Sequence, residues 1–266
     1  MQEITSIKNA KVKHLYQLGR KSALRKETGT FLIEGVKELE KALKNNIKVE
    51  TIYFYPQIIE KEWMQEIKKK YPGIEWVKIS KPVFEKLAYR NTTGGVIALA
   101  KKKSHALEDL SLSDNPLILI AEKTEKPGNI GAMLRTADGA GLDAFILVNP
   151  QTDLYNPNVI RSSLGTVFSV NIAIIEDPES LKKFLKEKNI SLYLATLQNA
   201  NPYYKEDYTK PAAFAVGAED KGLTEEFRKI PGKGVYIPMK GDADSLNVSV
   251  SAAILSYEGL RQRENR

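Results

Sequence analysis

The sequence predicts an α/β protein in two parts: a smaller α/β unit over residues 1–105 and a larger unit over residues 116–266 with a mostly parallel sheet. Two observations predict this fold class. Strand-like and helix-like apolar patterns alternate along both halves, and the second half contains continuous apolar runs, which are typical of strands covered on both faces. Between the halves, KKKSHALEDLSLSDNP (101–116) lacks an apolar period, so we expect a linker at 106–115.

The first thirty residues predict a basic amphipathic helix that runs into an exposed loop. Val12, Leu15, Tyr16 and Leu18 are spaced for one buried stripe. A solvated helix face would carry the same pattern. If the segment binds nucleic acid, its contacts are expected from Arg20, Lys21, Arg25 and Lys26.

The rest of the first half alternates strands and helices. Strands are expected at FLIEG (31–35), VETIYFY (49–55), IEWVKI (74–79) and VIALA (96–100), and helices at VKELEKALKN (36–45), near 57–70 and from Pro82. The pattern predicts a compact α/β unit.

The second half opens with a strand, a helix and a strand. LILIA (117–121) and AFILV (144–148) are the strands, and the helix between them places Ile130, Met133, Leu134 and Ala137 on one face. Further strands are expected within VFSVNIAII (167–175), ISLYLAT (190–196), AAFAVG (212–217) and GVYIP (234–238), with helices near 178–188 and from about Asn247 to Gln262.

Composition narrows the possible functions. The chain has 266 residues, no cysteine and two histidines, so thiolate chemistry is excluded and a histidine-based zinc site is not expected. No apolar stretch approaches the length of a membrane span, and the first residues lack the apolar core of a secretory signal. We therefore expect a cytoplasmic protein that needs neither membrane nor metal.

The basic charge is concentrated in the first half. The net charge is +7, and residues 1–110 carry 22 Lys and Arg against 13 Asp and Glu. This asymmetry is compatible with binding to an anionic polymer, but also with an ordinary positive surface.

Glycines and polar residues follow the late strands. The chain has no complete dinucleotide fingerprint and no P-loop, whereas Gly217 and Gly241 come after strands of the second half. Ligands bind at the carboxyl ends of parallel strands, so we expect these loops to line a pocket. Ser245 and Asn247 stand where the last helix begins; they could be N-caps, or they could bind the adenine and carboxylate of S-adenosylmethionine.

Three other polar residues have an ordinary structural interpretation and a functional one. Asn129 could cap a helix, Arg135 could be solvated or paired with Asp138, and Glu219 could face solvent. A carboxylate just past a buried strand can also hold an arginine by two hydrogen bonds. We predict a pair between Glu219 and Arg135.

Taken together, these segments resemble the three motifs of the SpoU (TrmH-type) RNA ribose 2′-O-methyltransferases of the SPOUT superfamily. The resemblance covers about residues 114–264 and is carried by Asn129 and Arg135, then Gly217, Glu219 and Gly222, then Ile237, Pro238, Met239, Ser245, Leu246 and Asn247. The chain departs from the family pattern at Asp220 and Ser251, and the resemblance places Asp220 in the loop that meets the RNA.

The resemblance implies a deep trefoil knot, a homodimer whose active site uses both subunits, and S-adenosyl-L-methionine as cofactor. By analogy, the cofactor would be bound by Thr196, Leu197, Gly217, Gly222, Ile237, Met239, Leu246 and Asn247. Catalysis would use Asn129, Arg135, Glu219, Ser245 and Asn247, with Arg135 gripping a substrate phosphate and orienting the hydroxyl group. The general base stays unassigned, because a guanidinium does not lose its proton near neutral pH.

The first half resembles, more loosely, the substrate-binding domain of rRNA-directed members of this family. This resemblance favours large-subunit (23S) rRNA as the substrate. A tRNA 2′-O-methyltransferase and a non-catalytic RNA-binding or ribosome-assembly protein of the same fold are the alternatives.

Overall fold

The computed structural model describes residues 2–89 and 94–264. Contacts divide the chain into two compact units. Unit 1 consists of Met1–Lys103 and Asp153–Ser169, and unit 2 of Ser104–Thr152 and Val170–Arg266. The segment 153–169 lies within the part that the sequence analysis assigned to the larger domain, but it packs in unit 1.

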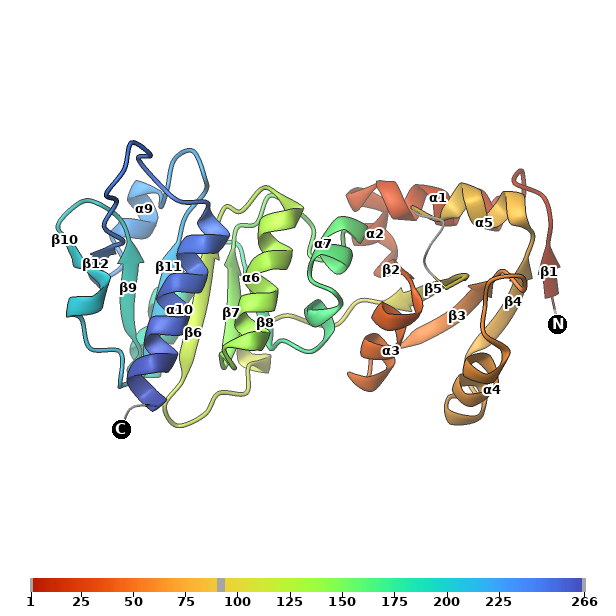
Figure 1. Ribbon diagram of the computed structural model, residues 1–266, viewed down its shortest axis with the longest axis horizontal. Coiled ribbons are helices and arrows are strands. Elements are labelled where there is room, and N and C mark those ends of the chain that lie inside the picture. The colour runs from red at the N-terminus through yellow and green to blue at the C-terminus, as the bar shows by residue number, and fades with distance from the viewer. Residues whose placement is uncertain (1, 90–93, 265–266) are drawn as a thin grey trace. The chain divides into compact units, whose positions relative to one another are not determined.

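Unit 1 is built on a five-stranded mixed sheet with helices on both faces (Figure 1). The strand order is β1-β4-β3-β5-β2, in which β5 runs antiparallel to both of its neighbours. The strands are β1 (Gln2–Ile4), β2 (Thr30–Glu34), β3 (Val49–Phe54), β4 (Glu75–Ile79) and β5 (Val96–Lys101). The helices are α1 (Ala10–Arg20), α2 (Ser22–Thr28), α3 (Val36–Lys44), α4 (Lys61–Lys70), α5 (Lys81–Leu87) and α7 (Pro157–Ser162).

Unit 2 contains a parallel sheet in the order β10-β12-β9-β11-β6-β7-β8. The strands are β6 (Leu117–Glu122), β7 (Ala144–Val148), β8 (Ile172–Ile175), β9 (Ser191–Ala195), β10 (Ala200–Pro202), β11 (Ala212–Val216) and β12 (Lys233–Tyr236). The helices are α6 (Pro127–Gly139), α8 (Pro178–Glu187), α9 (Glu225–Arg228) and α10 (Val248–Glu264). Short 3₁₀ turns cover Leu107–Asp109 and Tyr203–Lys205 in unit 2, and Thr166–Phe168 in unit 1.

Helices cover both faces of this parallel sheet, as the continuous apolar runs predicted. Helices α6 and α10 lie side by side on one face (Figure 1), where Gly259 of α10 lies directly over Leu117. On the other face, Ile118 and Ile120 pack with Leu181 and Leu185 of α8. Alternate residues of β6 are therefore buried by different helices, which is why the strand lacks a polar face. Within the described residues, no helix is long and apolar enough to cross a bilayer.

Several local predictions need correction. The expected loop after the first helix is a second helix, α2, and the helix expected from about residue 57 begins at Lys61. The strand expected at 167–175 is confined to Ile172–Ile175. Before it, Leu164 and Gly165 have φ angles of 53° and 78°, and these left-handed residues break the extended path, so Val167 and Phe168 are buried in a turn.

Arg25 is not an exposed RNA contact, which corrects the sequence prediction. Its side chain is only 2% exposed and its Nε donates to Asp153 Oδ2 at 2.5 Å, while Nη1 donates to the carbonyl oxygen of Leu18 at 2.7 Å. Nearby, the rings of Phe31 and Tyr155 stack with centroids 4.1 Å apart. These contacts attach the segment 153–169 to the rest of unit 1.

We predict that Arg25→Ala lowers the free energy of unfolding by about 3 kcal/mol, because it leaves the carboxylate of Asp153 partly buried without its main partner. Urea denaturation followed by circular dichroism measures the change. Lys26→Ala is the matched control, since Lys26 lies on the same helix and is exposed. Equal stability of the two variants would contradict a stabilising role for the buried pair.

Candidate active site

A cluster of polar side chains surrounds the carboxylate of Glu219 in unit 2. Its Oε1 accepts hydrogen bonds from the side-chain amides of Asn129 and Asn247, the second at 3.0 Å, and its Oε2 accepts one from the ammonium group of Lys126. The amide of Asn247 also donates to Asn129 Oδ1 at 3.2 Å. Three segments far apart in sequence therefore meet at one carboxylate.

The loop after β11 aims Glu219 at this point. A Cβ atom on Gly217 would lie 2.0 Å from the carbonyl carbon of Gly222, so the close approach of the two backbone segments requires glycine. Ala218 and Gly222 close the loop by exchanging backbone hydrogen bonds of 3.2 and 2.9 Å. Glu219 is held inside this six-residue loop.

The two helix starts contribute the amides. Asn129 is in the first turn of α6, but its side chain donates to Glu219 instead of capping the helix. Asn247 precedes α10, where its Oδ1 accepts from the backbone N–H of Ser249 at 3.0 Å while its amide reaches Glu219. Asn247 therefore caps the helix with its Oδ1 atom and contacts Glu219 with its amide nitrogen.

The donors around Glu219 keep it ionised. Hydrogen bonding to Lys126 is the largest of the effects that lower the pKa of this carboxyl, followed by the hydrogen bond from Asn129; the charge of Lys126 and the amide of Asn247 add to them. The same pairing raises the pKa of Lys126. Glu219 is thus a fixed acceptor that orients donors, and an ionised carboxylate has no proton to give as a general acid.

A small cavity of about 60 Å³ adjoins the cluster. Its walls include Thr124, Lys126, Asn129 and Glu219, and the buried hydroxyl of Thr124 has no hydrogen-bond partner within the described residues. A space of this size suits one small polar group. Neither Thr124 nor Lys126 was predicted, because a single threonine or lysine near a loop carries no signal in the sequence.

The predicted pair between Glu219 and Arg135 does not form within the chain. Arg135 is exposed on α6 and makes no hydrogen bond or ion pair among residues 2–89 and 94–264. It follows Asn129 by six residues, which on a helix is about 9 Å along the axis and about 120° around it. The two side chains therefore leave different faces of α6.

The remaining predicted residues follow the carboxyl ends of three adjacent strands. Thr196 and Leu197 follow β9, Gly217 follows β11, and Ile237 and Met239 follow β12. Leu246, near the start of α10, is half-buried, as are Ile237 and Met239, whereas Leu197 is 78% exposed. Ser245 is exposed and makes no hydrogen bond in the described chain. These loops leave apolar side chains accessible at the carboxyl ends of the strands, where α/β proteins bind ligands.

Residues 116–257 match the model of the SpoU rRNA methylase family. The chain belongs to this family. Residues 9–98 also match the model of the MRM3-like substrate-binding domain. The resemblance inferred from the motifs is confirmed.

Relatives in the family differ in how much of the chain they cover. A protein of Bacillus subtilis named 23S rRNA (guanosine(2553)-2′-O)-methyltransferase RlmP is 33% identical over 97% of this chain and 98% of its own. The tRNA (guanosine(18)-2′-O)-methyltransferase of Thermus thermophilus is 36% identical over 55% of this chain and 75% of its own. The crystal structure of an AdoMet-bound rRNA methyltransferase from Sinorhizobium meliloti has a TM-score of 0.88 at 27% identity, covering 98% of this chain and 97% of that one.

Unit 1 carries a second group of candidate contacts. Arg20, Lys21 and Lys26 are exposed, as predicted for RNA-binding residues. The guanidinium of Arg20 lies 3.6 Å from the centre of the Tyr16 ring, and the ammonium of Lys86 lies 4.1 Å from it. Two cations on one ring, neither in an ion pair within the described residues, are well placed to bind an anion.

We predict that Lys126→Met raises the pKa of the Glu219 carboxyl towards its ordinary value of 4.5, because the largest effect that lowers it is removed. A ¹³C NMR titration of the side-chain carboxylates measures this pKa. Lys221→Met is the control, since Lys221 lines the same small cavity without a hydrogen bond or ion pair to Glu219. If both variants leave the titration unchanged, Lys126 does not set the charge state of the site.

Proposed function

We propose that the protein transfers a methyl group from S-adenosyl-L-methionine to a ribose 2′-hydroxyl group of 23S rRNA. The observation that carries this proposal is the full-length similarity to an enzyme named for that reaction, together with the cluster around Glu219. The loops after β9, β11 and β12 supply half-buried apolar side chains and backbone groups that suit an adenosyl group. Bound S-adenosyl-L-methionine supplies an electrophilic methyl group, and we assign no metal ion to the reaction.

Positioning by this chain's own residues supplies most of the acceleration in this mechanism. Glu219 stays ionised and fixes the amides of Asn129 and Asn247, so their remaining polar atoms have one orientation. Arg135 binds the phosphate next to the target ribose and orients the hydroxyl group. Arg135 has no acidic partner within the described chain, so its guanidinium is available to an anion. The general base is left unassigned.

We further propose that the active enzyme is a cytoplasmic homodimer whose C-terminal part forms a trefoil knot. Arg135 and Glu219 do not meet within one chain, and in the proposed homodimer the Arg135 of the second copy would approach each cluster and bind the substrate phosphate beside it. This arrangement preserves the predicted arginine–glutamate pair as a contact between subunits. It is supported by the resemblance of the motifs, which implies a shared active site.

The first half of the chain favours rRNA over tRNA. The relative named for 23S rRNA matches both halves, whereas the relative named for tRNA matches little more than half of this chain. Residues 1–110 carry the excess of positive charge, which is suited to contacts with phosphates that do not read sequence. The match to the substrate-binding domain is thus the observation that favours rRNA over tRNA as the substrate.

We predict that Arg135→Ala lowers kcat for methyl transfer at least a hundredfold and leaves the Kd for S-adenosyl-L-methionine nearly unchanged, because its contacts are to RNA. Transfer of labelled methyl to unmodified 23S rRNA and tRNA transcripts measures the rate, and calorimetry measures cofactor binding.

Arg261→Ala is the control for this prediction, as Arg261 is exposed and paired with Glu258 on α10. Equal losses of turnover and cofactor affinity in Arg135→Ala would refute the assigned role. Cofactor binding without transfer to any RNA would favour an assembling particle as substrate, and no cofactor binding at all would favour a non-catalytic protein.

We predict the opposite behaviour for Leu246→Asp, which should weaken binding of S-adenosyl-L-methionine about tenfold or more by placing a charge against the apolar part of the cofactor. Affinity for RNA should change little. Calorimetry with cofactor and filter binding with rRNA separate the two effects. Gly217, which the resemblance also assigns to the cofactor, is unsuitable for this test because any side chain there collides with the backbone of the Glu219 loop.

A further inference from the structure

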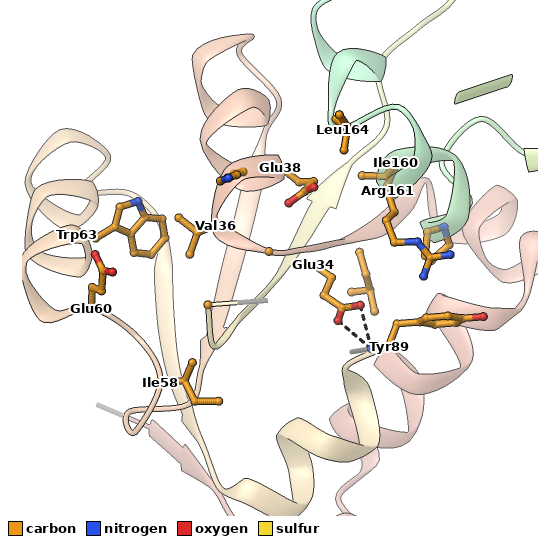
Figure 2. Close-up of a pocket in the computed structure, with 15 residues that line it drawn as sticks. Glu34, Val36, Glu38, Ile58, Glu60, Trp63, Tyr89, Ile160, Arg161 and Leu164 are labelled. Carbon is orange, nitrogen blue, oxygen red and sulfur yellow. Dashed lines mark hydrogen bonds between the residues drawn. The ribbon is translucent and has the colours of Figure 1, made fainter. Parts of the chain in front are cut away.

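Unit 1 contains a cavity of about 540 Å³ whose lining includes none of the residues assigned above to methyl transfer (Figure 2). This volume lies in the range of ligand-binding pockets, about 300–1,000 Å³. Flat side chains stand on opposite sides of it: Trp63 of α4 on one side, and Tyr89 with Arg161 of α7 on the other. Val36, which lies beside Trp63, and Ile58 add apolar surface to the cavity. The shape suits a planar ligand.

Tyr89 and Arg161 form a stacking surface at the edge of the cavity. Tyr89 is 60% exposed, and the guanidinium carbon of Arg161 lies 4.8 Å from the centre of its ring. Arg161 is held in place because its Nη2 donates to Asn158 Oδ1 at 2.7 Å. Unpaired bases of RNA stack on tyrosine rings and on guanidinium planes of this kind. A large exposed aromatic ring with a fixed cation beside it therefore points to a nucleobase.

The charges that line the cavity favour a neutral group with hydrogen-bond donors. The lining includes three carboxylates, those of Glu34, Glu38 and Glu60, and two cations, Lys37 and Arg161. Both oxygens of Glu34 accept from the backbone N–H of Tyr89. Glu38 and Glu60 form no hydrogen bond or ion pair through their side chains in the described part of the chain. Such a lining would repel a phosphate, but carboxylates accept hydrogen bonds from the amino groups of bases. Guanine, cytosine and adenine carry an amino group and uracil does not.

Positive charge is placed outside the cavity, where a phosphate could lie. Lys86 is three residues before Tyr89, so their Cα atoms are at most about 11 Å apart. Lys86 and Arg20 both contact the Tyr16 ring and neither is in an ion pair within the described residues. A phosphate near these cations and a base in the cavity is the charge arrangement expected for one nucleotide of a single strand.

We propose that this cavity binds one unpaired nucleobase of the substrate RNA, at a nucleotide other than the one that is methylated, with preference for a base that carries an amino group. The proposal rests on the proposed function in so far as the occupant belongs to the substrate RNA. It gives unit 1 a specific contact in addition to its general attraction for phosphates.

Trp63 is a built-in reporter for this site. The chain has two tryptophans, and the buried indole N–H of Trp76 has no hydrogen-bond partner among residues 2–89 and 94–264. Trp76→Phe therefore removes the second signal without breaking a hydrogen bond seen there. In this variant, titration with GMP should change the Trp63 emission at a concentration at least threefold lower than titration with UMP. Unmodified 23S rRNA transcript should produce the same change at far lower concentration.

Variants at Tyr89 test the contact with RNA. Tyr89→Ala should raise the KM for rRNA about tenfold, because it removes the stacking surface, while kcat and the Kd for S-adenosyl-L-methionine stay within twofold of the unchanged protein. Tyr89→Phe should restore the KM, since the ring and not the hydroxyl group is used. Tyr204→Ala is the control, as Tyr204 is an exposed tyrosine of unit 2.

Three results would overturn the proposal: a Trp63 emission that no nucleotide and no rRNA alters, a Tyr89→Ala variant with normal circular dichroism and unchanged KM, or a response to a lysine-rich peptide without a response to nucleotides. The last would assign the cavity to a protein partner. Absence of methyl transfer by the unchanged protein would remove the proposed function instead, and the fluorescence titration does not depend on that activity.

Discussion

The site depends on the hydrogen bonds that the carboxylate of Glu219 accepts. Donors from the start of α6 and the start of α10 converge on it, and they can do so because β11 and β6 are neighbours in the sheet, which brings the loop after β11 close to α6. The loop itself exists only with glycine at position 217, where two backbone segments nearly touch. The glycine at position 217 thus fixes the position of the Glu219 carboxylate, and this carboxylate orients the side-chain amides of Asn129 and Asn247. Asn247 extends this chain of dependence, because the residue that reaches Glu219 also caps α10.

The elements that the sequence predicted well are those whose burial leaves a local pattern. Strand β6 reads as a continuous apolar run because helices cover both of its faces, and α6 shows its buried stripe at helical spacing. The three-residue edge strands β1 and β10 were not predicted, since three residues are too few to show a period. The environment of Arg25 could not be predicted either. Its partner lies 128 residues away, and the sequence around an arginine does not distinguish a buried side chain from an exposed one.

The sequence predicted which residues lie in the cluster around Glu219 better than it predicted which of them contact each other. Asn129, Glu219 and Asn247 came from the motifs and the structure brings them together. Lys126 was missed because it resembles any surface lysine, although it is the main influence on the pKa of Glu219. The pairing of Arg135 with Glu219 ignored the angle at which side chains leave a helix. Contacts of this kind depend on three-dimensional placement, which spacing along the chain does not contain.

The path of the chain between the two units has a consequence for dissecting the protein. The polypeptide leaves unit 1 after Lys103, returns to it for Asp153–Ser169 and leaves it again. A fragment cut once at the expected linker would therefore lose Tyr155 from the face of Phe31 and Asp153 from the side of Arg25. It would expose the ring of Phe31 and leave Arg25 without the carboxylate that it pairs with. The substrate-binding half is continuous as a family match but discontinuous as a folded body, so a fragment that follows the family match omits part of the unit in which it packs.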